Sequence, residues 1–228
     1  MPLTSFETFL NSIEIHPLIE PTISKDEYIA IDLSIYNTEL KKINISSSND
    51  LEEFIWNYLK LKNAKVTYGG YLEKRGIYQR SNYFNQKKTE TERNIHLGLD
   101  LWIESETPIF APLEGRIHSF KNNTNYGDYG PTIILEHNVD GTIFYTLYGH
   151  LSLDSIENLK IGVQVQQGEQ IATLGTAEVN GDYPPHLHFQ IIKDIENYKG
   201  DYPGVANQQN LDFFKENCPD PTLLLKLS

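Results

Sequence analysis

Short runs of alternating hydrophobic and polar residues fill the middle of the chain, and turn residues such as Asn122-Asn123 and Gln167-Gly168 separate them. Alternation with a period of two is typical of half-buried β-strands. No helical period of useful length interrupts these runs, so we predict a mainly β fold with a small antiparallel β-domain, either a barrel or a sandwich. The predicted strands cover residues 95–102, 109–110, 115–120, 132–137, 142–151, 163–165, 169–174 and 186–192.

The first part of the chain mixes helical and extended patterns. Hydrophobic residues at helical spacing predict a short helix that ends at Ser12, and residues 28–35 read as a strand. A longer helix is predicted after a polar turn, with Asp50 as its N-cap and Glu53 completing a capping box. These elements predict an N-terminal α/β appendage, residues 1–93, packed on the β-domain.

The chain is long enough, at 228 residues, to bury one sizeable core. Its last part begins as a loop, turns helical around residues 211–216 and ends on Leu223-Leu-Leu225. We therefore predict one compact unit made of an N-terminal appendage, a β-domain over residues 94–193 and a C-terminal helical tail over residues 194–228 that wraps back onto the core.

The charge of the chain limits its partners. A formal net charge of −12 argues against nucleic acid and anionic membranes, which both attract basic surfaces. A single cysteine, Cys218, excludes an intramolecular disulfide. Residues 1–24 contain no lysine or arginine and no continuous apolar run, which predicts a cytoplasmic protein without a secretory signal or membrane anchor.

Two histidines stand two residues apart, at His186 and His188, in a predicted strand. Side chains at this spacing emerge on the same face of a strand. Pro184 and Pro185 keep the entry to this strand extended. Paired imidazoles on one face predict a site for metal binding or proton transfer.

A second pair of candidate ligands, His96 and Asp100, lies far upstream. On a straight strand these residues would lie roughly 13 Å apart, close to the limit for meeting on one ion. Gly98 between them permits a bend that would bring the two side chains together. With one of the paired histidines they make three protein ligands, and a fourth position left to water is typical of a catalytic zinc site.

Three motifs occur in one order along the chain: His96-Leu-Gly-Leu-Asp100, Tyr148-Gly-His-Leu151 and His186-Leu-His-Phe189. In this order they resemble the motifs of the lysostaphin-like (LytM-type) zinc metallopeptidases, and the resemblance covers residues 94–193. It implies that His96, Asp100 and His188 bind Zn²⁺. It also implies that His150 and His186 stay unligated and act on the peptide and on the zinc-bound water.

Two stretches depart from the family pattern. Gln190 stands where family members commonly carry glutamate, and the bulky residues 182–185 replace a run of small residues. Residues 182–185 and the aromatic-rich segment 71–84, which contains Arg75 and Arg80, are candidates to narrow the cleft. His16, His118 and His137 belong to no motif and are expected to be ordinary surface or core histidines.

The resemblance implies a zinc metalloendopeptidase that hydrolyses short glycine- or D-alanine-containing peptides of the peptidoglycan type. Family members that cut cell walls are generally exported, whereas this N-terminus predicts a bacterial cytoplasmic enzyme acting on small soluble peptides. One alternative is a non-catalytic module that binds a peptide or peptidoglycan fragment on the same fold. Another is a metal-binding structural or sensory domain in which the N-terminal region is the functional part.

Overall fold

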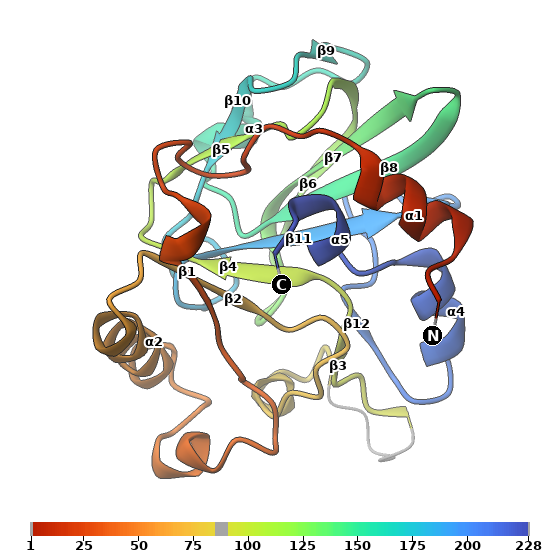
Figure 1. Ribbon diagram of the computed structural model, residues 1–228. Helices are drawn as coiled ribbons and strands as arrows, with labels where there is room; N and C mark the ends of the chain where they lie inside the picture. Colours follow the sequence, from red (N-terminus) through yellow and green to blue (C-terminus); the bar gives the residue numbers. More distant parts are fainter. Residues whose placement is uncertain (1, 85–90, 228) are drawn as a thin grey trace.

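A computed structural model describes residues 2–84 and 91–227 and is built around one mixed sheet (Figure 1). The strand order in this sheet is β1-β2-β4-β11-β8-β7-β6-β9. Its pairs are antiparallel except for β1 with β2, which run parallel. The strands are β1 (Tyr28–Ala30), β2 (Val66–Gly69), β4 (Leu99–Trp102), β6 (Gly115–Asn123), β7 (Gly130–Val139), β8 (Thr142–Gly149), β9 (Gln164–Val165) and β11 (His186–Ile192).

Smaller elements surround this sheet. Two further pairs of strands form separate two-stranded sheets: β3 (Ile95–His96) with β12 (Val205–Ala206), and β5 (Pro108–Phe110) with β10 (Gln170–Thr173). Figure 1 shows α2 beside the β1–β2 edge, and α1 next to α5 in front of the sheet. The helices are α1 (Ser5–Ser12), α2 (Ser48–Lys62), α3 (Asp154–Glu157), α4 (Leu211–Asn217) and α5 (Thr222–Leu225), with 3-10 turns η1 (Lys25–Glu27), η2 (Thr38–Lys42) and η3 (Ile77–Arg80).

The β-rich prediction for the middle of the chain is confirmed, but the sheet stays open within the described residues. The N-terminal segment explains why a barrel does not form. Strand β2 pairs with β4, and β1 lies beyond β2, so these two strands extend the sheet at the edge that a barrel would have to close. The predicted strand over residues 95–102 also divides into β3 and β4, because the chain bends at Leu97 and Gly98.

Two N-terminal boundaries differ from the prediction. Strand β1 ends at Ala30, and soon afterwards the Asp32 carboxylate accepts a hydrogen bond from the Ser34 amide and turns the chain. Helix α2 begins one turn before the predicted cap, because the Ser47 hydroxyl accepts the hydrogen bond from the Asp50 amide at 3.2 Å. The N-cap of this helix is therefore Ser47, and the prediction of Asp50 was wrong.

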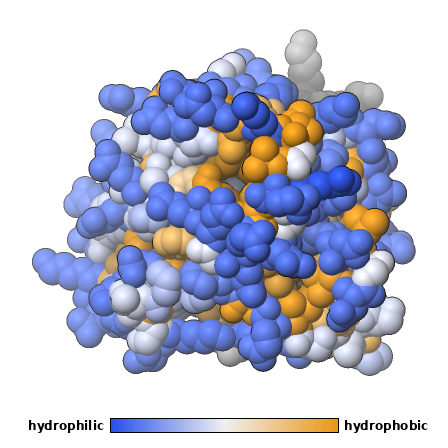
Figure 2. Space-filling model, turned by 90° about the horizontal axis from the view of Figure 1, so that it is seen from above, coloured by the Kyte–Doolittle hydropathy of each residue, from blue (hydrophilic) through white to orange (hydrophobic). Residues whose placement is uncertain are grey.

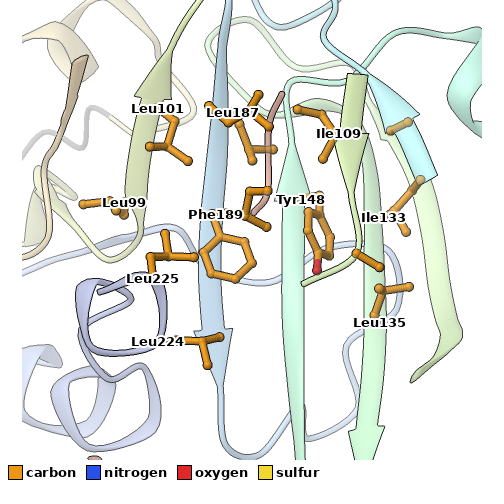
Figure 3. Packing of buried hydrophobic residues seen from close by; sticks show 14 of the residues in the cluster. Leu99, Leu101, Ile109, Ile133, Leu135, Tyr148, Leu187, Phe189, Leu224 and Leu225 are labelled. Carbon is orange, nitrogen blue, oxygen red and sulfur yellow. The ribbon is translucent and has the colours of Figure 1, made fainter. Parts of the chain in front are cut away.

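Side chains along β11 alternate between the hydrophobic core and the opposite face of the sheet. Leu187, Phe189 and Ile191 are fully buried and belong to the main hydrophobic cluster. Figure 3 shows this layer, in which α5 covers the strands with Leu224 and Leu225. The intervening residues of β11 are polar and lie on the opposite face, where the candidate site is formed.

The surface is mainly hydrophilic on the face that Figure 2 shows, with hydrophobic residues gathered in patches between charged and polar ones. None of the helices in residues 2–84 and 91–227 combines the length and hydrophobicity needed to cross a bilayer.

The core makes a testable contribution to stability. Replacing the fully buried Ile133 by alanine is expected to lower the free energy of unfolding by about 2–5 kcal/mol, because it leaves a cavity between the strands. Ile143→Ala on the neighbouring strand is the control: half of that side chain is exposed, so the loss should stay below about 1 kcal/mol. Urea denaturation measures both, and equal losses would contradict the assignment of this layer as the core.

Candidate metal centre

The register between β4 and β11 places His188 opposite Asp100. Directly opposed residues on an antiparallel pair share one face of the sheet, so the two side chains meet without any loop to position them. Nδ1 of His188 lies 3.1 Å from Oδ1 of Asp100. Both residues are almost fully buried.

His96 reaches the same point from the other side of the bend. Its Nε2 lies 2.9 Å from Nδ1 of His188 and 3.2 Å from Oδ1 of Asp100. Gly98 allows this approach, because a Cβ atom at that position would lie 2.5 Å from the His188 ring. The glycine therefore permits the bend and also leaves space for the ring of His188.

Carbonyl groups fix the tautomers of the two candidate histidine ligands. Nδ1 of His96 donates to the Gly70 carbonyl at 3.0 Å, which leaves Nε2 unprotonated. Nε2 of His188 donates to Oε1 of Gln190 at 3.0 Å, which leaves Nδ1 unprotonated. The Gln190 amide is held in this orientation because its nitrogen donates to the Pro203 carbonyl. Both lone pairs are thus directed toward Asp100, an arrangement common for metal-ligating imidazoles.

Arg75 holds the other oxygen of the Asp100 carboxylate. Its guanidinium is almost fully buried and pairs with Oδ2 of Asp100 through Nη1. Nε of Arg75 contacts Glu73 at 2.6 Å, and Glu73 also accepts a hydrogen bond from the Leu33 amide. Asp100 therefore presents Oδ1 to the histidines while Oδ2 is neutralised from the N-terminal segment.

The charges at this centre are set by burial and by these contacts. Burial lowers the pKa of His96 to about 4, so its imidazole is neutral at pH 7. Burial alone would raise the pKa of Asp100, but His96 and Arg75 outweigh that effect and keep it well below its usual value. The centre thus combines the neutral imidazole of His96 with the ionised carboxylate of Asp100.

His150 and His186 form a second pair beside this group. Their ring centroids lie 4.1 Å apart, and Nε2 of His186 lies 3.9 Å from Oδ1 of Asp100. Nδ1 of His150 donates to the Asn180 carbonyl at 2.6 Å, and Nδ1 of His186 donates to the Pro184 carbonyl at 2.7 Å. Burial lowers the pKa of His186 to about 4 and holds that of His150 well below its usual value. Each ring therefore keeps a free Nε2 lone pair.

The residues His96, Asp100 and His188 fit a metal ion. Each offers one unprotonated ligand atom, and these atoms lie within 4.8 Å of one another. Within the described residues no other group of three histidine, cysteine, aspartate or glutamate side chains meets this condition. Two nitrogens and one oxygen in a buried pocket are a ligand set that suits zinc. The structure thus brings together all five residues that the motifs singled out.

The other three histidines lie outside this centre. His137 is buried, but Nδ1 contacts the Glu114 carbonyl and Nε2 contacts the Thr146 hydroxyl, so neither ring nitrogen has a free lone pair for a ligand. His16 and His118 are only partly buried and make local contacts.

Sequence similarity to metallopeptidases agrees with a metal centre in the middle of the chain. Residues 94–201 match the sequence model of Peptidase family M23. The match spans slightly less than half of this chain, which is therefore similar to that family over these residues. An uncharacterized metalloprotease of Haemophilus influenzae is 32% identical over 95 residues, and the cell division protein DipM of Caulobacter vibrioides is 33% identical over 94 residues. The matches cover 42% and 41% of this chain but only 18% and 14% of those proteins.

Among solved structures, the catalytic domain of the antimicrobial peptidase lysostaphin from Staphylococcus simulans shares 26% sequence identity with this chain, at a TM-score of 0.38. The alignment covers 60% of this chain and 97% of that domain. Arg75, Glu73 and the rest of the N-terminal segment lie outside the residues that match the M23 family model.

The candidate centre of the M23 segment opens into a cleft whose walls come from distant parts of the chain. Arg80 pairs with Asp182 at 3.1 Å, and its guanidinium lies 4.4 Å from the centre of the Tyr183 ring. Tyr183 in turn packs against the rings of His150 and His186. Segments 71–84 and 182–185 are therefore in contact beside the cleft, and a role of these segments in narrowing it stays a prediction.

Sequence reasoning did not identify Arg75 or Glu73 as site residues, and it treated Gln190 only as a departure from the family pattern. The two charged residues precede the first motif by about 20 positions, and no motif marks them. The one available signal was physical: a buried aspartate needs a compensating partner, and Arg75 is one of few basic residues in an apolar, aromatic stretch.

The contact between Arg75 and Asp100 can be tested by substitution. Arg75→Gln is expected to weaken Zn²⁺ binding by roughly 10–100-fold, because Asp100 loses the group that orients and neutralises Oδ2. Competition with a chromophoric chelator measures the affinity. Arg116→Gln removes an arginine of β6 that pairs with Glu136 of β7, so it is the matched control and should leave the affinity unchanged. An Arg75 variant with wild-type affinity would show that the ion pair does not support the centre.

Proposed function

We propose that this protein is a zinc-dependent metallopeptidase. The observation that carries the proposal is the convergence of three buried ligand atoms, from His96, Asp100 and His188, with their lone pairs fixed by second hydrogen bonds. The match of residues 94–201 to the sequence model of peptidase family M23 supports the same conclusion.

The metal and the neighbouring histidines would each supply a part of the hydrolysis of a peptide bond. Bound zinc would polarise a peptide carbonyl and make water more acidic. His150 and His186 are neutral at pH 7 and have free Nε2 lone pairs beside the ligands, so we assign them the transfer of protons to and from the reacting groups. Imidazole is suited to this role because small changes of environment move its pKa across the physiological range.

We further propose that the substrates are short peptides of the peptidoglycan type that contain glycine or D-alanine, as the resemblance to lysostaphin-like enzymes implies. A cytoplasmic location stays a prediction, and it would restrict the substrates to small soluble peptides. Cell fractionation combined with assays on soluble peptides and on intact cell walls tests this pair of proposals. Recovery outside the cytoplasm together with lysis of intact walls would overturn both.

Metal content gives the first test. The purified protein is expected to hold one zinc ion per chain, and His96→Ala or His188→Ala should lower this occupancy sharply because each removes a ligand. Elemental analysis measures the occupancy. His118→Ala, a partly buried histidine on β6, is the control that should keep the metal. Full occupancy in both ligand variants would exclude this site as the metal centre.

The two remaining histidines are expected to behave differently. His150→Ala and His186→Ala should keep the zinc but lose roughly 10²–10⁴-fold in the rate of peptide hydrolysis, as expected for residues that transfer protons. Metal analysis and a peptide assay on the same samples separate the two effects. If either variant loses zinc as readily as His188→Ala, that histidine is a ligand. If the wild-type protein binds zinc but cleaves no peptide, the non-catalytic binding module replaces the enzyme.

A further inference from the structure

A cavity of about 530 Å³ extends from the candidate metal centre to a wall that the M23 segment does not supply. His96, Asp100, His150, His186 and His188 all line this cavity. The opposite wall comes from the N-terminal segment and is aliphatic, formed by Leu33, Ile35, Leu40, Ile43, Ile45 and Ile77.

The aliphatic wall begins directly beside the metal centre. Arg75 contacts Asp100, and the next residue, Gly76, is covered by side chains of the wall: a Cβ atom there would lie 2.9 Å from Cδ1 of Ile45 and 3.7 Å from Cγ2 of Ile35. The residue that pairs with Asp100 is therefore followed directly by a residue that packs against the aliphatic wall.

Trp102 makes the same connection on the side of β4. Its ring stacks on His186 with a centroid distance of 5.5 Å and an interplanar angle of 19°. It also belongs to the hydrophobic cluster that contains Leu33, Leu40 and Ile77. Trp102 thus stacks on one of the candidate catalytic histidines and belongs to the same hydrophobic cluster as part of the aliphatic wall, while the Arg75 guanidinium lies 5.4 Å from the centre of its ring.

Part of this wall is accessible. Ile35 is 40% exposed, and Ile43 and Ile45 are partly buried, whereas Leu33, Leu40 and Ile77 lie beneath them. The polar side chains of Asn37 and Lys41 also line the cavity. An apolar recess with a few polar groups, next to reactive groups, is typical of a subsite for a ligand.

We propose that this wall is a subsite for a bulky apolar side chain, aliphatic or aromatic, of the peptide substrate near the bond that is cleaved. The inference rests on the proposed peptidase function and narrows its substrates. Glycine has no side chain and alanine has a single methyl group, so peptides made only of these residues leave the subsite unfilled. The aliphatic side chains remove apolar surface from water only when the substrate supplies a matching group.

A set of peptides that differ at one position tests the subsite. Each peptide carries glycine, alanine, leucine or phenylalanine on one side of the same peptide bond, and a second set varies the other side. On one of the two sides of this bond, the wild-type enzyme is expected to favour leucine or phenylalanine over glycine. The expected ratio of kcat/KM is roughly 10–200-fold, the range that hydrophobic pockets give for small apolar differences.

Variants of the wall should change this ratio. Ile45→Trp fills the recess, and Ile43→Ser makes it polar, so both are expected to reduce the leucine-to-glycine ratio of kcat/KM by about 10-fold or more. The ratio is independent of how much protein is folded. Leu61→Ser is the matched control, because Leu61 is 79% exposed on α2 and does not line the cavity. Its ratio should equal that of the wild type.

The outcomes of these experiments distinguish a failure of the proposed subsite from a failure of the proposed peptidase activity. Cleavage with no side-chain preference, or variants that leave the ratio unchanged, would overturn the subsite and leave the peptidase intact. If no peptide is cleaved, calorimetry measures the affinity of the zinc-loaded protein for the same peptides and tests the subsite without relying on hydrolysis. Tighter binding of the leucine peptide that Ile45→Trp removes would support the subsite and overturn the hydrolase, and equal binding of all peptides would overturn both.

Discussion

The antiparallel register between β4 and β11 is the constraint on which the candidate centre depends. It sets His188 opposite Asp100, while the alternate residues of both strands point into the main hydrophobic core. A shift of β11 by one residue would turn His188 into the core and move Leu187 and Phe189 to the opposite face of the sheet, away from the core. The same hydrophobic burial that stabilises the sheet therefore also fixes the distance between two ligand atoms.

Hydrogen bonds from outside the sheet then complete the geometry. Four imidazoles meet here, and each donates one N–H to an oxygen: the carbonyls of Gly70, Asn180 and Pro184, and the side chain of Gln190. Three of these acceptors lie on loops, which determine which nitrogen of His96, His150 and His186 faces the centre. Gln190 lies on the same strand as His188 and does this for that ring. Replacement of the family's glutamate by Gln190 preserves the acceptor that His188 needs.

Most strands of the middle of the chain and the grouping of all five motif residues could be predicted from the sequence, because alternation and short motifs are local signals. His96 and Asp100 needed only the bend at Gly98 to meet. The open sheet could not be predicted in this way, since the pairing of β2 with β4 depends on residues about 30 positions apart. The ion pair between Arg75 and Asp100 is equally non-local. Ser47 was missed as a helix cap for another reason: Ser46, Ser47 and Ser48 are chemically alike, and only the backbone decides which of them caps.

The position of β4 in the sheet shows how far the family-matched residues depend on the rest of the chain. In this chain β4 is an interior strand, with β2 on one side and β11 on the other. A fragment of residues 94–201 alone would turn β4 into an edge strand with unpaired backbone groups, and such edges promote association between chains. It would also lack Arg75, the cation that pairs with Oδ2 of Asp100. In this chain, the sheet and the ion pair at the candidate centre therefore both extend into the residues that precede the family-matched segment.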